Sequence, residues 1–336
     1  MRMRFVGDPH IGKLGTIMGD DVALRRQAKL LRRCIRDAEA DDCSHVVVLG
    51  DLYHGPHPTQ EELIAVIRAF ASTSLEVWVY LGNHDVDDNT LNSFRLIREL
   101  PEAGALTHVR FIEEPVTIKE DKARIRVVPW KKKYAKGDFD PGADLTLFHD
   151  GVVGAKGDNG RPFTEGHGIP KSVFGDGLAV SGHLHTPQRV GRIHYPGTPA
   201  QTSFGEKLPK RISTAVWSKR EFSIEERDFD PPWVLEQVAF DPKNPPKCDA
   251  PGTLYSLDVS LGSPGNRWLL DHPKVVRVNS GTKRKTAEVS KVIEMTQKAE
   301  GADDSELLTR FLRSHTSLSQ MERARAVKID RKLGES

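Results

Sequence analysis

Five short polar motifs, each directly after an apolar run, constrain this chain more than any other feature of its sequence. They are Asp8-Pro9-His10, Gly50-Asp51, Gly82-Asn83-His84-Asp85, the isolated His149, and Gly182-His183-Leu184-His185. The preceding runs, such as 45–49 and 75–81, have the length and composition of buried strands. Between them, 21–40 and 61–70 show apolar residues at helical spacing. This alternation predicts an α/β fold with a mostly buried sheet.

The polar groups of these motifs have the chemistry of metal ligands. Parallel strands end at one edge of a sheet, so groups that are far apart in the sequence are expected to meet there. The candidate ligands are the oxygens of Asp8, Asp51 and Asn83 and the imidazoles of His10, His149, His183 and His185. Seven ligands are too many for one ion, so we expect two ions with one carboxylate bridging. Mixed oxygen and nitrogen ligands suit Mn²⁺, Fe²⁺ or Zn²⁺, and two such ions clamp a phosphoryl group and activate water.

Taken one at a time, these residues say little about function. A single histidine is more often structural than a ligand, and Gly-Asp alone is an ordinary turn. The five motifs in this order, each after a predicted strand, favour the metal site.

Composition excludes several other classes. The length of 336 residues predicts two or three domains, and no apolar run is long enough to span a membrane. The basic start Met1 to Arg4 has no long apolar stretch behind it, so we expect no secretory signal and a cytoplasmic protein. Cys34, Cys43 and Cys248 are odd in number and show no C-x-x-C spacing, so they predict neither a disulfide framework nor a cysteine zinc site. The formal net charge of +2 means that any contact with nucleic acid must be local.

The chain divides into three predicted parts. Residues 1–229 carry the motifs, and 108–228 are mostly strand-like, apart from a long connection over 150–177. A proline-rich break at 230–232 begins a small β-rich domain over 230–285. Residues 286–336 contain two apolar helical patterns and a basic tail, which predict either a docking module for a partner or helices that pack on their own domain.

The motif set resembles the D-x-H, G-D, G-N-H-D/E, isolated His and G-H-x-H pattern of the calcineurin-like metallophosphoesterases. Two further segments resemble SbcD-type nuclease subunits, bacterial relatives of the nuclease in the MRN repair complex. Leu52-Tyr53-His54 is similar to their G-D-L-F-H, and Tyr195 to Pro199 followed by Ser203-Phe204-Gly205-Glu206 is similar to their Y-P-G-S-P and S-F-x-E. The resemblance implies an α/β fold with a two-layered β-sandwich core flanked by helices, a small β-rich capping and DNA-binding domain over 230–285, and a C-terminal helical pair.

The resemblance also implies a role for each site residue. One metal is expected between Asp8, His10, Asp51 and His185, and the other between Asp51, Asn83, His149 and His183, with Asp51 bridging. His84 is implied to be the acid that protonates the leaving oxygen, with Asp85 orienting it. His54 matches a histidine linked in the family to exonuclease action. This chain departs from the family at Phe148-His149-Asp150-Gly151, where a carboxylate follows the ligand.

A basic patch and two apolar faces outside the motifs each allow two interpretations. Lys131, Lys132 and Lys133, beside Trp130 and Tyr134, form a basic patch that we expect either to bind DNA or to be an ordinary solvated loop. The stretches 61–71 and 91–100 are predicted to be amphipathic helices, whose apolar faces are expected to form a homodimer interface as in the family, or to pack on the sheet. The resemblance to the SbcD-type subunits implies that a docking module over 286–336 binds an SbcC-type ABC ATPase.

The motifs and the resemblance together predict a two-metal DNA phosphodiesterase, an exonuclease or endonuclease subunit of an SbcCD-like complex acting in DNA end processing, repair or recombination. Mn²⁺ is the expected ion, with Mg²⁺, Fe²⁺ and Zn²⁺ as alternatives, and the expected location is the cytoplasm of a bacterial or phage-infected host cell. The alternative functions are a stand-alone phosphatase or cyclic-nucleotide phosphodiesterase with the same motifs, and a binding scaffold that has lost catalysis. The complete ligand set argues against the scaffold.

Overall fold

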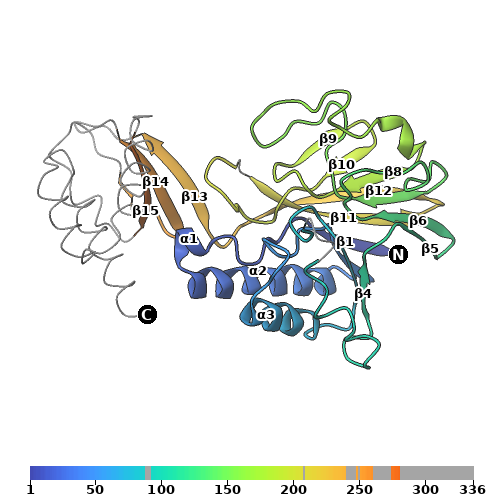
Figure 1. The fold of residues 1–336 in the computed structure, drawn as a ribbon, viewed down its shortest axis with the longest axis horizontal. Coiled ribbons are helices and arrows are strands. Elements are labelled where there is room, and N and C mark those ends of the chain that lie inside the picture. The colour runs from blue at the N-terminus through green and yellow to red at the C-terminus, as the bar shows by residue number, and fades with distance from the viewer. Residues whose placement is uncertain (88–91, 207–208, 240–246, 249, 260–273, 281–336) are drawn as a thin grey trace, which may run out of the picture. The chain divides into compact units, whose positions relative to one another are not determined.

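Two six-stranded sheets form the core of the protein (Figure 1). The structure is a computed structural model that describes residues 1–87, 92–206, 209–239, 247–248, 250–259 and 274–280. The first sheet has the order β12 (Glu221–Phe229), β11 (Lys210–Ser218), β1 (Arg2–Val6), β2 (His45–Val48), β3 (Glu76–Tyr80) and β4 (Val109–Ile112). The second has the order β5 (Val116–Glu120), β6 (Ala123–Val128), β7 (Leu145–Phe148), β8 (Leu178–Ser181), β10 (Ile193–Tyr195) and β9 (Gln188–Val190).

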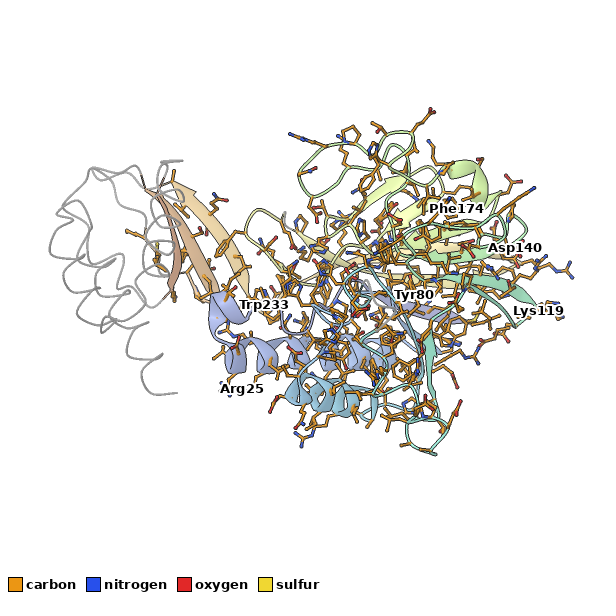
Figure 2. The ribbon with its side chains drawn as sticks, in the orientation of Figure 1. Arg25, Tyr80, Lys119, Asp140, Phe174 and Trp233 are labelled. Atoms are coloured by element: carbon orange, nitrogen blue, oxygen red, sulfur yellow. The ribbon has the colours of Figure 1, made fainter. Side chains whose placement is uncertain are left out.

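The two sheets pack face to face around one apolar layer. Phe5, Val47 and Trp78 from the first sheet lie in the same buried cluster as Val127 and Leu147 from the second. The Tyr80 hydroxyl, at the end of β3 (labelled in Figure 2), donates a 2.9 Å hydrogen bond to the Phe148 carbonyl at the end of β7. This bond joins the sheets at the ends from which the polar motifs leave.

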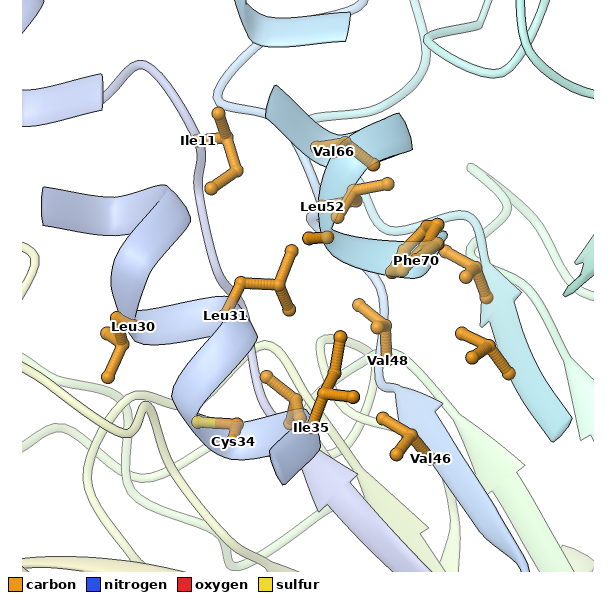
Figure 3. Close-up of a cluster of buried hydrophobic side chains, with 14 of the residues drawn as sticks. Ile11, Leu30, Leu31, Cys34, Ile35, Val46, Val48, Leu52, Val66 and Phe70 are labelled. Carbon is orange, nitrogen blue, oxygen red and sulfur yellow. The ribbon is translucent and has the colours of Figure 1, made fainter. Parts of the chain in front are cut away.

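Helices cover the other face of the first sheet. α2 (Asp20–Ala40) and α3 (Gln60–Phe70) contribute Leu31, Ile35 and Phe70 to a cluster that also contains Val46 and Val48 of β2 (Figure 3). A short helix, α1 (Gly15–Met18), precedes α2. The side chain of Thr59 accepts a bond from the Glu62 amide and the side chain of Glu62 accepts one from the Thr59 amide, a capping box that fixes the start of α3.

The long connection over 150–177 packs on the second sheet. It has its own short 3₁₀ helix, η1 (Lys171–Phe174). Val152, Ile169 and Phe174 are buried against Phe148 and Tyr195 in a third cluster. The segment is therefore packed, although its sequence shows no helical or strand period.

The structure confirms the predicted α/β class with its two-layered β-sandwich. One element differs, because the helix predicted over 91–100 is a run of turns in its described part, which begins at Asn92. The Asn92 side chain accepts a bond from the Phe94 amide, and the Ile97 amide donates to the Phe94 carbonyl with i to i+3 spacing. The apolar pair Phe94 and Ile97 is therefore buried without a regular helix.

A small three-stranded sheet follows the sandwich. It consists of β13 (Val234–Ala239), β14 (Thr253–Val259) and β15 (Val275–Ser280), as the β-rich pattern predicts. Trp233 and Leu235 at its start belong to the same buried cluster as α2 and α3. The boundary at 230 and the DNA-binding role of this part stay predictions. The C-terminal helical pair lies outside the described residues. Within the described ranges, no helix is long and apolar enough to cross a membrane.

Candidate metal centre

The predicted ligands come together at the carboxyl ends of the parallel strands. β1, β2 and β3 run parallel in the first sheet, and β7 and β8 run parallel in the second. Asp8 follows β1, Asp51 follows β2 and Asn83 follows β3, while His149 and His183 follow β7 and β8. Groups that are 175 residues apart, such as His10 and His185, are thereby in contact.

The backbone at four of these residues is in the left-handed region. The φ angles are 43° at Asp8, 43° at His10, 47° at Asp51 and 73° at His183. Residues other than glycine rarely adopt this conformation, which costs on the order of 1–3 kcal/mol per residue and persists where the surroundings enforce it. Such strain is concentrated at functional sites, and here it turns four ligand side chains into one cluster.

One group of ligands surrounds His10. The Nε2 atoms of His10 and His185 lie 3.1 Å apart, and Asp8, His10 and His185 place one ligand atom each within 4.8 Å of one another. Asp51 Oδ2 lies 3.5 Å from His10 Nε2. All four side chains are buried or nearly so.

A second group surrounds His149. His149 Nε2 lies 3.4 Å from Asp51 Oδ2 and 3.1 Å from Asn83 Oδ1. His183 Nδ1 lies 2.9 Å from the same amide oxygen. His149 Nδ1 lies 2.6 Å from the Leu49 carbonyl, which can only accept, so Nδ1 carries the proton and Nε2 is left to bind an ion. Asp51 Oδ2 therefore faces both groups.

These residues fit two divalent cations. Asp8 Oδ2 is a buried side-chain atom without a hydrogen-bond partner in the described part of the chain, and buried polar atoms are seldom left so. The donors are carboxylate and imidazole, and no cysteine belongs to the clusters found among the described residues. Asp8, His10, Asp51 and His185 would hold one ion and Asp51, Asn83, His149 and His183 the other, if the ligands divide as the resemblance implies.

Two glycines make room for this cluster. A Cβ atom on Gly50 would collide with His149 Nδ1, and one on Gly182 would collide with the Leu49 carbonyl oxygen. Neither clash can be relieved without displacing a ligand or its backbone support. The close packing of the motifs therefore requires glycine at both positions.

The electrostatics of the cluster favour positive charge. Burial raises the pKa of Asp8 to about 6, although His149 and His185 oppose the shift. Burial also raises the pKa of Asp51, but His149 and His10 outweigh it and hold that pKa below its usual range. Burial lowers the pKa of His149, but Asp51 and Asp8 raise it to about 10. The carboxylates thus attract positive charge to His149. In the metal-free protein that charge is a proton on the ring.

His84 and His54 lie beside the ligands. Their rings stack with centroids 5.1 Å apart, and the His84 ring meets the His10 ring edge-on at 4.8 Å. His84 Nδ1 lies 3.2 Å from the His54 carbonyl and donates to it. Burial and the neighbouring His84 lower the pKa of His54.

Asp85 does not orient His84 in the predicted way. Its buried carboxylate accepts bonds from the amides of Leu52, Tyr53 and Gly82 and from the Ser93 hydroxyl. It therefore holds together the backbone segments that carry Asp51 and Asn83. Since these four donors bond to Asp85, the His84 ring bonds to the His54 carbonyl instead. A catalytic role for Asp85 stays a prediction.

The three predicted DNA-binding lysines differ from one another. Lys131 is half-buried, and its ammonium lies 2.8 Å from Glu114 and 3.6 Å from Asp138. Lys132 and Lys133 are exposed. Lys131 is thus partly neutralised, and the DNA-binding role of the patch remains a prediction.

Four charged residues near the ligands have no role in the sequence-based prediction. Glu206 lies 3.1 Å from His185 Nδ1 and is paired with the buried Lys210, and Asp158 of the 150–177 segment lies 3.4 Å from the same nitrogen. Burial holds the pKa of Lys13 below its usual value, although the nearby carboxylates of Glu206, Asp51 and Asp8 oppose this shift. Glu206 is within reach of sequence reasoning, since it ends the S-F-x-E segment, whereas no pattern marks Asp158 or Lys13.

This chain belongs to the calcineurin-like phosphoesterases, because the family model matches residues 1–194. The family consists of phosphoesterases that bind divalent metals. Among solved structures, the chain is similar to an archaeal phosphodiesterase, with 11% identity over 68% of this chain and 100% of that one and a TM-score of 0.34. It is also similar to the Pseudomonas putida nuclease MPE, with 19% identity over 43% and 59% of the two chains and a TM-score of 0.28. A hypothetical protein of Pyrococcus horikoshii OT3 matches with 14% identity over 68% and 88% and a TM-score of 0.33.

Metal binding is expected to release protons. With a pKa of about 10, His149 is protonated near pH 8 in the metal-free protein, and an ion must displace that proton. Affinity should therefore rise about tenfold per pH unit for each proton released, up to about pH 10, and more steeply below about pH 6, where Asp8 is also protonated. Titration calorimetry with Mn²⁺ in buffers of different protonation enthalpy measures the release. Heats that do not depend on the buffer would contradict this electrostatic description.

Proposed function

We propose that this protein is a two-metal DNA phosphodiesterase, the exonuclease and endonuclease subunit of an SbcCD-like complex that processes DNA ends. The observation that carries the proposal is the position of Asp51 Oδ2, 3.5 Å from His10 Nε2 and 3.4 Å from His149 Nε2. One carboxylate oxygen that faces two ligand groups is the arrangement expected of a bridging ligand. Two bound divalent ions, with Mn²⁺ as the expected metal, would supply charge stabilisation and an activated water.

His84 is proposed as the general acid. Hydrolysis forms a bond from water oxygen to phosphorus and breaks a phosphorus–oxygen bond to the sugar, so the departing oxygen needs a proton. The His54 carbonyl accepts from His84 Nδ1, which stabilises the ring when it carries two protons and leaves the other nitrogen to donate. His54, stacked on His84, keeps that ring in place beside the His10 group.

The choice of DNA as substrate rests on the resemblance of Leu52-Tyr53-His54 and of Ser203 to Glu206 to SbcD-type segments. A homodimer and an SbcC-type ABC ATPase partner are proposed on the same basis. Ile64 of α3 is 46% exposed and Leu96 is 65% exposed, which is compatible with a partner surface over 61–71 and 91–100. The proposed ATPase-docking segment over 286–336 lies outside the described residues.

Replacing His84 with alanine tests the proposed mechanism. The full-length wild type should degrade linear duplex DNA with Mn²⁺, and His84→Ala should be slower by about 10²–10⁴-fold with unchanged bound Mn²⁺. His57→Ala is the control, because the His57 side chain is 66% exposed and pairs with Asp87 instead of joining the cluster. The measurements are an end-labelled DNA assay and metal analysis of the same samples.

Loss of metal from His84→Ala would place His84 among the ligands instead. A wild type that hydrolyses small phosphoesters or cyclic nucleotides but leaves linear, circular and hairpin DNA intact would favour the stand-alone phosphatase or cyclic-nucleotide phosphodiesterase.

Replacing Lys131, Lys132 and Lys133 together by alanine tests the DNA surface. If these lysines bind phosphates, the slope of log K against log salt should fall by about 0.9 for each phosphate that is no longer neutralised. Changing Lys119, Lys122 and Lys219 to alanine is the matched control, since these exposed lysines lie near the amino ends of β6 and β1, away from the ligands. Fluorescence anisotropy with duplex DNA over a range of salt gives the slopes. Equal slopes for both triple variants would make the predicted patch an ordinary surface.

A further inference from the structure

The buried carboxylate of Glu206 contacts the metal ligand His185 at the ring nitrogen that does not face the other ligands. Glu206 Oε1 lies 3.1 Å from His185 Nδ1, on the other side of the ring from Nε2, which faces His10. The Glu206 side chain is 1% exposed. A buried carboxylate in this position is expensive unless it is fully bonded and neutralised.

Its surroundings meet both requirements. The hydroxyls of Thr198, Thr202 and Ser203 and the amide of Thr202 all donate to the Glu206 carboxylate, at 2.7–3.2 Å. The Lys210 ammonium, which is 0% exposed, lies 2.8 Å from Oε2 and neutralises the charge. All of these neighbours are donors, so the geometry leaves the Glu206 carboxylate as an acceptor.

An ionised carboxylate decides which nitrogen of His185 carries the proton. Because Glu206 Oε1 can only accept, the proton of the neutral ring stays on Nδ1 and the Nε2 lone pair is directed toward His10. Lys210 also donates to the His185 carbonyl at 3.3 Å, so the pair holds the backbone as well as the ring of this ligand.

We propose that Glu206, neutralised by Lys210, is a positioning residue that fixes the tautomer and orientation of His185 and thereby sets the affinity of the ion held by the His10 group. The proposal rests on the two-metal centre of the proposed function and assigns a role to the glutamate of the S-F-x-E segment. The second group, around His149, obtains its orientation from the Leu49 carbonyl and does not depend on Glu206.

Asp158 offers a built-in comparison. Its carboxylate also approaches His185 Nδ1, at 3.4 Å, but its side chain is 37% exposed. Water screens an exposed carboxylate, so Asp158 should contribute far less than Glu206.

The test is equilibrium dialysis of the full-length chain with Mn²⁺, in wild type, Glu206→Gln, Asp158→Asn and the double variant Glu206→Gln with Lys210→Met. Wild type should bind two ions. Glu206→Gln should bind one with unchanged affinity and the other about 10–100-fold more weakly, whereas Asp158→Asn should change either affinity less than about fivefold. The double variant removes the unpaired buried ammonium, so it should regain thermal stability without regaining the weakened site.

Other outcomes separate the possible failures. Two unchanged affinities in Glu206→Gln would overturn the positioning role, and so would recovery of the weak site in the double variant, since a merely structural role predicts that recovery. Equal weakening of both sites would overturn it too. A wild type that binds fewer than two ions would instead overturn the metal centre of the proposed function.

Discussion

The structure depends on two buried carboxylates, Asp8 and Asp51, that share one small volume with the imidazoles of His10, His149 and His185. Both are 2% exposed or less, and in this setting like charges need a cation. The unpartnered Asp8 Oδ2, among the described residues, and the raised pKa of His149 are two consequences of that requirement. Divalent ions would meet it better than a proton, because each neutralises more charge and accepts several ligands at once.

The sandwich makes the cluster possible by bringing strand ends together. Ligands come from loops after five strands in two sheets, and the bond from Tyr80 to Phe148 joins the sheets beside them. Asp85 bonds to the loop amides, and Glu206 and the Leu49 carbonyl orient one histidine in each group. The ligands are thus held in place by the backbone and by buried polar groups, which also sustain the positive φ angles.

Much of this arrangement can be predicted from the sequence. Apolar runs ending in Asp, Asn and His predict both the sheet and the metal ligands, because strand pattern and ligand chemistry are local properties of the sequence. The S-F-x-E segment stands out without a role, since only the fold shows that Glu206 reaches His185. The contact of Asp158 with His185 and the packing of Val152, Ile169 and Phe174 on the second sheet cannot be predicted, because the sequence of 150–177 shows no helical or strand period.

The differences have a similar origin. Residues 91–100 have helical spacing, yet the Asn92 side chain bonds to the following backbone and the chain turns instead. Sequence adjacency pairs Asp85 with His84, whereas the bonds of Asp85 go to amides that only the folded loops bring near. The spacing of residues in the sequence indicates which face of a helix or strand they occupy. It does not indicate which of several nearby hydrogen-bond donors a buried carboxylate such as Asp85 accepts from.

The most direct test of the central claim is the electron paramagnetic resonance spectrum of the full-length protein loaded with two equivalents of Mn²⁺. If Asp51 bridges two ions, they lie about 3.5–4 Å apart, and the spectrum should show an exchange-coupled pair that Asp51→Asn abolishes. Two uncoupled Mn²⁺ signals in the wild type, or a coupled spectrum that persists in Asp51→Asn, would contradict the bridging role of Asp51.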